Sequence, residues 1–433
     1  MELLVVFGAN LNADTELLRT PLSVACSNGK LEIARILIKG GSNTNARDKD
    51  GWTPLHTSIR YGHLDVVRLL LDSGADANIQ KPDQWTPIHL ASANGSLDIT
   101  KLLVERGAVV DSRNDKGETP LDRAAANGSF EVARFLIEEA GAAVSARDDK
   151  GWTPFHTAAR CGYLHIAKYL LDQGVTVDDR NGQEETPLDL ASGCGRLEVV
   201  RFLIEQGADI HAIDKKGWNS LHIAAYKGHV EVVRMLLDAG ASVDICNGIQ
   251  KTSLALASDQ GKVDVARLLI ERGADLNARD IQSWTSLHFA SRNGQYDIAQ
   301  LLLDSGADVN VQKNDLWSSL HLSASNGHGN ISRLLIQRGA LIDIRNDRQE
   351  TPLDRAAANG KINAARLLID HGAKVTVVDG NGWTPLHSAS HGGHLEVVKL
   401  LLQRGANVEA VNDDKKSAEE VASESNRSGL QAS

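Results

Sequence analysis

The chain alternates short apolar segments with polar turns. Residues 48–80 contain two segments predicted to be helices. The first runs from Thr53-Pro54 to Gly62, because a Thr side chain caps a helix start, proline fits the first helical position and glycine ends a helix. The second ends at Gly74, and one face of it is apolar. That face is formed by Leu64, Val67, Leu70 and Leu71. Each helix is shorter than about 12 residues and marginal alone, so we expect neighbouring segments to stabilise it.

This pattern recurs with a period of 33 residues. One interval, from Thr119 to Thr153, is 34 residues long, and Ala140 is the extra residue. In every unit a glycine follows the first helix and another follows the second, in series that begin at Gly29 and Gly41. The twelve units begin their first helices at Thr20, Thr53, Thr86, Thr119, Thr153, Thr186, Asn219, Thr252, Thr285, Ser318, Thr351 and Thr384.

Four consecutive units have serine where the others have proline, at Ser220, Ser253, Ser286 and Ser319. Serine does not pre-set the backbone φ angle. We therefore expect the stretch from Trp218 to Leu335 to open before its neighbours.

A 33-residue period with Thr-Pro-Leu-His and Gly-Ala motifs resembles the ankyrin repeat. The resemblance implies an all-α repeat solenoid of helix-turn-helix units joined by β-hairpin-like loops, stabilised by stacking. Residues 14–414 are expected to form twelve repeats in one continuous solenoid. Residues 1–13 resemble the second helix of a truncated repeat, with apolar Val6 and Phe7 at solvent-facing positions. Residues 415–433 are expected to form a degenerate, polar capping helix and a frayed tail.

Composition and charge argue against several classes of protein. A net charge of −10 argues against a nucleic-acid binder that works by phosphate neutralisation. Aromatic residues are 4% of the chain, which predicts an aliphatic, Ala-rich core. The apolar runs are too short for a membrane span, and the four cysteines form no CxxC pair. We expect a monomeric protein of a reducing compartment, cytoplasmic or nuclear, with no membrane insertion.

Catalytic and metal chemistry find little support in the sequence. Seven of the 15 histidines stand at the Thr-Pro-Leu-His position, where the resemblance implies a structural role. Equivalent positions in adjacent repeats lie about 9–10 Å apart, too far to share one metal ion or to join Cys161 and Cys194 in a disulfide. No phosphate-loop, zinc-protease, nucleophile-elbow or kinase motif is present. We expect no enzymatic activity, no cofactor and no metal site.

The repeats fall into three types. Asp-type repeats have Trp and His four and eight positions after an Asp, as in Asp48/Trp52/His56, and Lys-type repeats begin instead with Lys81 or Lys313. Asn-type repeats have Glu and Asp in place of Trp and His. They are Asn114/Glu118/Asp122, Asn181/Glu185/Asp189 and Asn346/Glu350/Asp354, with Asn247/Lys251/Ala255 as a variant. The order Asp-type, Lys-type, Asn-type occurs twice, 232 residues apart, which indicates duplication of a multi-repeat block.

Candidate contact residues follow from the resemblance, which places variable positions of the hairpins and first helices in a concave groove. Trp, Tyr and Arg dominate binding hot spots. The candidates are Trp52, Arg60, Tyr61, Trp85, Trp152, Arg160, Trp218, Tyr226, Lys227, Trp284, Arg292, Trp317, Trp383 and His391. The tryptophans fit packing between hairpins as well as recognition. Glu118, Glu185 and Glu350 favour a partner with alternating apolar and basic features.

Two functions remain open. The first is a non-catalytic scaffold that binds a protein or extended peptide along the concave face. The second is a ligand-sensing, regulatory ankyrin region of a larger signalling protein or enzyme whose N-terminal part is absent.

Overall fold

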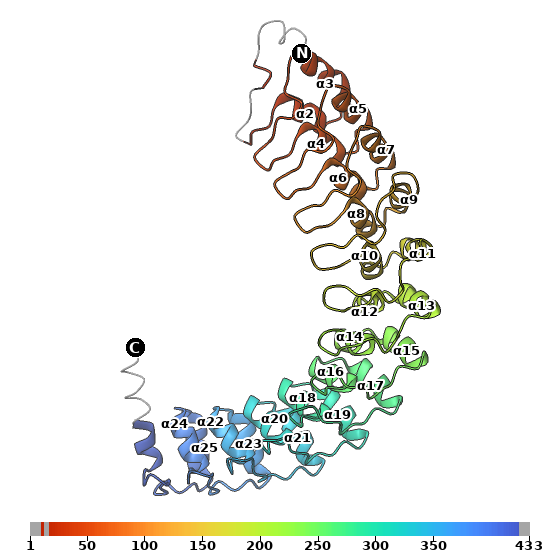
Figure 1. Cartoon of the computed structure of the whole chain (residues 1–433). Helices are drawn as coiled ribbons and strands as arrows, with labels where there is room; N and C mark the ends of the chain where they lie inside the picture. Colours follow the sequence, from red (N-terminus) through yellow and green to blue (C-terminus); the bar gives the residue numbers. More distant parts are fainter. Residues whose placement is uncertain (1–9, 13–16, 424–433) are drawn as a thin grey trace. The chain divides into compact units, whose positions relative to one another are not determined.

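The computed structural model describes residues 10–12 and 17–423 (Figure 1). The chain consists of two compact units, Met1–Lys215 and Lys216–Ser433. We call them the N-terminal and C-terminal units and describe each by itself. The truncated repeat expected over residues 1–13 and the tail after residue 423 lie almost entirely outside the described residues. A single continuous solenoid over residues 14–414 stays a prediction.

The N-terminal unit consists of helix pairs, each with a first helix of 7–8 residues and a second helix of 9. The first helices are α2 (Pro21–Ser27), α4 (Pro54–Arg60), α6 (Pro87–Asn94), α8 (Pro120–Asn127), α10 (Pro154–Cys161) and α12 (Pro187–Gly193). The second helices are α3 (Leu31–Lys39), α5 (Leu64–Asp72), α7 (Leu97–Glu105), α9 (Phe130–Glu138), α11 (Leu164–Asp172) and α13 (Leu197–Glu205). Contacts join first helices to first helices and second helices to second helices of adjoining repeats.

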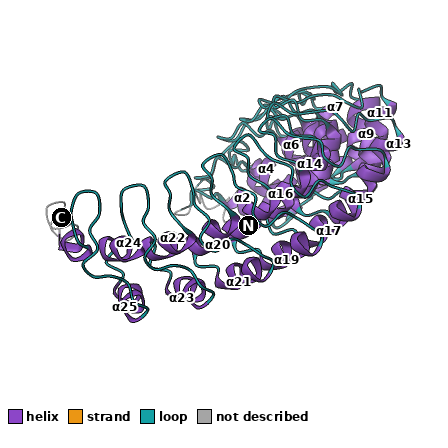
Figure 2. Ribbon diagram, turned by 90° about the horizontal axis from the view of Figure 1, so that it is seen from below, coloured by secondary structure: helices purple, strands orange, loops and turns teal. Residues whose placement is uncertain are grey.

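The C-terminal unit has the same construction. Its first helices are α14 (Ser220–Lys227), α16 (Ser253–Asp259), α18 (Ser286–Asn293), α20 (Ser319–Asn326), α22 (Pro352–Ala358) and α24 (Pro385–His391). Its second helices are α15 (Val230–Asp238), α17 (Val263–Glu271), α19 (Tyr296–Asp304), α21 (Gly329–Gln337), α23 (Ile362–Asp370) and α25 (Leu395–Gln403). Figure 2 shows α20, α22 and α24 in one row, α21, α23 and α25 in another, and the long loops rising from the first row. Residues 418–423 are also helical, with Ala418 and Val421 buried.

The predicted helix boundaries are confirmed. In α4, the Thr53 side chain accepts a hydrogen bond from the His56 backbone N–H, and Pro54 occupies the first helical position. Every glycine predicted to end a helix has a positive φ, for example 75° at Gly62 and 87° at Gly74. At that φ a β-carbon is strained, which explains why this position is glycine in each repeat.

The core is aliphatic, as the composition predicts. Its buried side chains are mainly Leu, Ala, Val and Ile, and phenylalanine supplies the buried aromatic residues. They belong to both helices of each pair, such as Leu55 and Ile59 in α4 and Val67 and Leu70 in α5. The second helices bury one face, whereas consecutive residues of a first helix are buried, as at Ile88, His89, Leu90 and Ala91 in α6. The core is therefore completed by the adjoining repeats. The structure is an all-α repeat solenoid within each unit.

The loops between repeats are hairpin-like. In one of them, the Asp48 N–H donates to the Trp52 carbonyl at 2.9 Å. In the described part of the chain, isolated antiparallel bridges replace full strands, as between Gln312 and Ser318. Neighbouring hairpins are hydrogen-bonded at their tips, since the Asp115 N–H donates to the Asp83 carbonyl at 3.1 Å. The first helices and hairpins therefore form a continuous surface within each unit.

Candidate partner-binding surface

The hairpin chemistry explains the repeat types. In the Asp-type hairpin, Asp48 Oδ1 accepts from the Trp52 N–H at 2.8 Å. In the Asn-type hairpin, Asn114 Oδ1 accepts from the Glu118 N–H at 2.9 Å, and its Nδ2 donates to Glu118 Oε2 at 2.7 Å. An aspartate has no N–H to donate and would repel the glutamate. Asn therefore accompanies Glu, whereas either Asp or Lys accompanies Trp.

The histidines of the Thr-Pro-Leu-His motifs are buried helix caps. His89 Nδ1 accepts from the Thr86 N–H at 3.2 Å, and Nε2 donates to the Glu118 carbonyl of the next repeat at 3.0 Å. Burial lowers the pKa of His56, His89, His288 and His321 to about 4. His89 and His321 engage both ring nitrogens with the backbone, whereas Nε2 of His56 and of His288 has no hydrogen-bond partner. A buried, neutral imidazole that caps its own helix through Nδ1 is a structural group, not a metal ligand or catalytic base.

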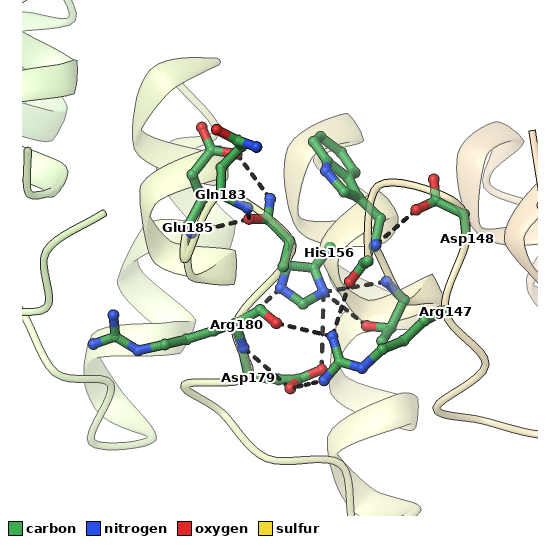
Figure 3. Close-up of polar contacts among 11 residues, drawn as sticks. Arg147, Asp148, His156, Asp179, Arg180, Gln183 and Glu185 are labelled. Carbon is green, nitrogen blue, oxygen red and sulfur yellow. Dashed lines mark hydrogen bonds and ion pairs between the residues drawn. The ribbon is translucent and has the colours of Figure 1, made fainter. Parts of the chain in front are cut away.

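Figure 3 shows the same arrangement around His156. Its Nε2 donates to the Asp179 carbonyl at 3.0 Å, and burial lowers its pKa against the opposing effect of the Asp179 carboxylate. Arg147 strengthens this link by donating to the Arg180 carbonyl at 2.8 Å and pairing with Asp179 at 2.5 Å. The linkers between repeats are thus fixed by side-chain to backbone hydrogen bonds.

Asn-type repeats place a carboxyl group at the histidine position. Asp122 Oδ2 accepts from the Thr119 N–H and hydroxyl, each at 2.8 Å. Burial, the largest effect, raises the pKa of Asp122 and of Asp354 to about 7, and neighbouring carboxylates add to it. Asp354 Oδ1 has no hydrogen-bond partner, which agrees with a carboxyl group that resists ionisation.

The candidate tryptophans are half-buried, and each ring lies near the histidine of its own repeat, as at 6.1 Å for Trp52 and His56. Five of them also contact the first-helix residue eight positions later. Three of these contacts are cation–π, with Arg60 5.0 Å from Trp52, Arg160 5.3 Å from Trp152 and Arg292 5.5 Å from Trp284. Two are edge-to-face, Trp218 with Tyr226 at 5.4 Å and Trp383 with His391 at 5.3 Å. The structure therefore brings ten of the candidates together as five pairs.

The other candidates have different neighbours. Tyr61 is 56% exposed and stacks on His63, with ring centroids 6.4 Å apart. Lys227 lies 5.6 Å from the Tyr226 ring. Trp85 and Trp317 instead contact arginines of the next repeat, Arg123 at 5.4 Å and Arg355 at 5.1 Å.

Sequence reasoning missed the cations supplied by the following repeat. Lys81 lies between two indoles, 4.6 Å from Trp52 and 5.9 Å from Trp85. Lys313 lies in the same way between Trp284, at 5.1 Å, and Trp317, at 5.8 Å. The available signal was the lysine of the Lys-type repeats, which occurs only where one Trp-containing repeat directly follows another.

Two of the three candidate glutamates are paired with an arginine, whereas Glu185 accepts from the neutral Asn181 amide at 2.7 Å. Glu118 binds Arg123 at 2.7 Å and accepts from Asn114, and Glu350 binds Arg355 at 3.0 Å. These partners lower the pKa of Glu118 despite its partial burial. The expectation of a partner with basic features therefore rests on Glu185 and stays a prediction.

Two surface hollows lie on this face. One, in the N-terminal unit, has a volume of about 280 Å³ and includes Arg19, Asp48, Trp52, Arg60 and Tyr61 in its lining. The other, in the C-terminal unit, has a volume of about 400 Å³ and includes Trp284, Arg292, Lys313 and Trp317. The face of first helices and hairpins is therefore both hollowed and rich in aromatic and cationic groups.

Comparison with protein families identifies the repeat. The family described as "Ankyrin repeats (3 copies)" matches residues 1–81, 73–148, 140–214, 207–280 and 287–379, and "Ankyrin repeat" matches residues 381–413. The chain belongs to the ankyrin-repeat family. A search of curated proteins finds no match. Ankyrin repeats are generally protein-interaction modules, typically non-catalytic.

Other chemistry on this ankyrin chain is sparse in the described part. No three His, Cys, Asp or Glu side chains gather there where they could hold a metal ion. No described helix is both long and apolar enough to cross a bilayer. Burial raises the pKa of the Cys26 thiol to about 12, and it also raises that of Cys161, so both disfavour the thiolate form.

Proposed function

We propose that this ankyrin protein is a non-catalytic scaffold that binds a protein or an extended peptide along its first helices and hairpins. The supporting observation is the repeated pairing of a half-buried tryptophan with an exposed first-helix residue eight positions later, as in Trp52–Arg60 and Trp284–Arg292. Rigid aromatic rings beside Arg or Tyr are the groups that dominate binding hot spots. Several such pairs on one face suit a partner that extends over several repeats.

We further propose that the protein is monomeric, is located in the cytoplasm or the nucleus, inserts into no membrane and binds no nucleic acid. A net charge of −10 supports the last point. The regulatory-region alternative uses the same surface. It differs in that partner binding would change the activity of a linked domain.

Photo-crosslinking tests the proposed surface. p-Benzoylphenylalanine placed at Tyr61 or Asn293, both exposed near the ends of first helices, should crosslink a partner in lysate of the source cells. The matched controls replace Arg68 and Arg267, which are exposed on second helices α5 and α17. Adducts at the first-helix positions alone would support the proposal. Adducts at the second-helix positions alone would contradict it.

A further inference from the structure

The hollow in the C-terminal unit has a cationic lining. Its charged groups are the cations Arg292, Lys313, Arg348 and Arg355 and the acids Asp315 and Asp347. Its apolar groups are Trp284, Trp317 and Leu322. Glu350, which binds Arg355, brings the acids to three against four cations. Positive charge therefore predominates there by one, although the whole chain has a net charge of −10.

The N-terminal unit contains the same set of residues 232 positions earlier. All nine lining positions recur, eight with the identical residue and one with Lys116 in place of Arg348. Two exposed positions nearby differ between the copies, since Lys49 corresponds to Ile281 and Tyr61 corresponds to Asn293. The nine positions have thus kept their chemistry since duplication, whereas these two adjoining positions have not.

The two copies also share their geometry. The central lysine side chain is 10% exposed at Lys81 and 11% at Lys313, and each is paired with one carboxylate, Asp83 or Asp315. Each lysine lies within 6 Å of two indole rings. Packing between two such rings holds the ammonium group in one place.

We propose that each of these two clusters of nine residues binds an acidic peptide segment, so that the chain takes two segments of the same kind. The C-terminal cluster lines its hollow, and the N-terminal cluster adjoins the other hollow through Trp52 and Arg60. The segment's carboxylates pair with the exposed cations, which are Arg60 and Lys116 in one cluster and Arg292 and Arg348 in the other. An apolar side chain lies on the tryptophans and Leu90 or Leu322. Guanidinium groups bind carboxylates in bidentate geometry, and the half-buried indoles supply apolar area. This inference rests on the proposed scaffold function and specifies the partner's chemistry and stoichiometry.

A random library of displayed 12-residue peptides, selected on the intact chain, tests the proposal. We expect the enriched peptides to be rich in Asp and Glu with an aromatic or aliphatic residue, and to bind more weakly at high salt. The best peptide, made synthetically, should bind with two molecules per chain by titration calorimetry. Lys313→Gln should leave one site, and Lys81→Gln with Lys313→Gln should weaken binding at least tenfold.

A second variant guards against misfolding. Lys116→Glu with Arg348→Glu reverses charge at two exposed positions and should weaken the peptide at least as much. The control, Arg134→Gln with Arg234→Gln, removes two positive charges, as many as the lysine double variant does, but from exposed sites on second helices. It should leave binding unchanged. The proposal would be overturned if basic or neutral peptides were enriched, or if none were. It would also be overturned by one bound molecule per chain, or if neither the lysine double variant nor the charge-reversal double variant weakened binding. Crosslinks at Tyr61 or Asn293 would still support the scaffold function in each of those cases.

Discussion

His89 joins two repeats through its imidazole ring, because Nε2 donates to the carbonyl of Glu118, 29 positions further along the chain, at 3.0 Å. On the other side of the ring, Nδ1 accepts from the Thr86 N–H at the start of its own helix. The ring is fully buried. One side chain therefore both caps a helix and holds the next hairpin.

Replacing this ring tests that double role. We expect His89→Ala to lower the free energy of unfolding by about 3 kcal/mol, because a stranded buried polar group costs about 1–3 kcal/mol and two groups lose their partner. Hydrogen exchange of the Thr86 amide should rise at the same time. His211→Ala, at an exposed site, should change stability by less than about 0.5 kcal/mol. Equal effects of the two substitutions would contradict the role of His89.

The buried histidines predict how stability changes with pH. Their folded-state pKa is about 4 for His56, His89, His288 and His321, against about 6.5 when unfolded. Between those values the unfolded chain binds protons that the folded chain does not, so stability falls as pH falls from 6.5 to 4. We expect calorimetric melting temperatures to peak near pH 6.5. A melting temperature that does not fall between pH 6.5 and pH 4 would contradict the buried, neutral rings.

The buried aspartates of the Asn-type repeats change stability with pH in the opposite direction. Asp354 has a folded-state pKa of about 7, well above the unfolded value of 3.8. Between these values the folded chain retains a proton that the unfolded chain releases, so this group destabilises the protein increasingly as pH rises. We expect Asp354→Asn to gain stability relative to wild type from pH 4 to pH 8, measured by denaturant unfolding. The exposed Asp347→Asn should show no such gain, and a flat difference for Asp354→Asn would refute the raised pKa.

Much of the fold was predictable because its signals are local. Thr53, Pro54 and Gly62 determine a helix start and end within ten residues, and the structure confirms both. The tryptophan pairs were partly predictable, since Trp52 and Arg60 were both candidates. Lys81 was not, because its contact with Trp52 crosses to the next repeat and depends on how the two hairpins stack. The reason that Asn accompanies Glu likewise needed the geometry of the Asn114 amide.

The serines that replace proline give a test of local stability. Ser253 is fully buried, and its hydroxyl has no hydrogen-bond partner. The preceding Thr252 has φ −82° and ψ 165°, an extended conformation that suits a residue before proline. We expect Ser253→Pro to raise the free energy of unfolding by about 0.4–1 kcal/mol and to slow hydrogen exchange in α16. Ser253→Ala separates the hydroxyl from the backbone effect, and equal gains from both would refute the contribution of φ.

Trp284 and Arg292 separate packing from recognition, because they contact each other but differ in exposure. The Trp284 ring stacks on Phe289 at 5.0 Å and lies beside Lys313, whereas Arg292 is exposed. We expect Trp284→Ala to lower stability by about 2 kcal/mol through lost aromatic contact, and Arg292→Ala to leave the melting temperature nearly unchanged. Arg292→Ala should nonetheless lower the affinity for the partner found by crosslinking about tenfold. If Arg292→Ala retained full partner binding while only Trp284→Ala lost it, the tryptophan would be a packing residue whose loss distorts the surface, and Arg292 would not be part of the contact.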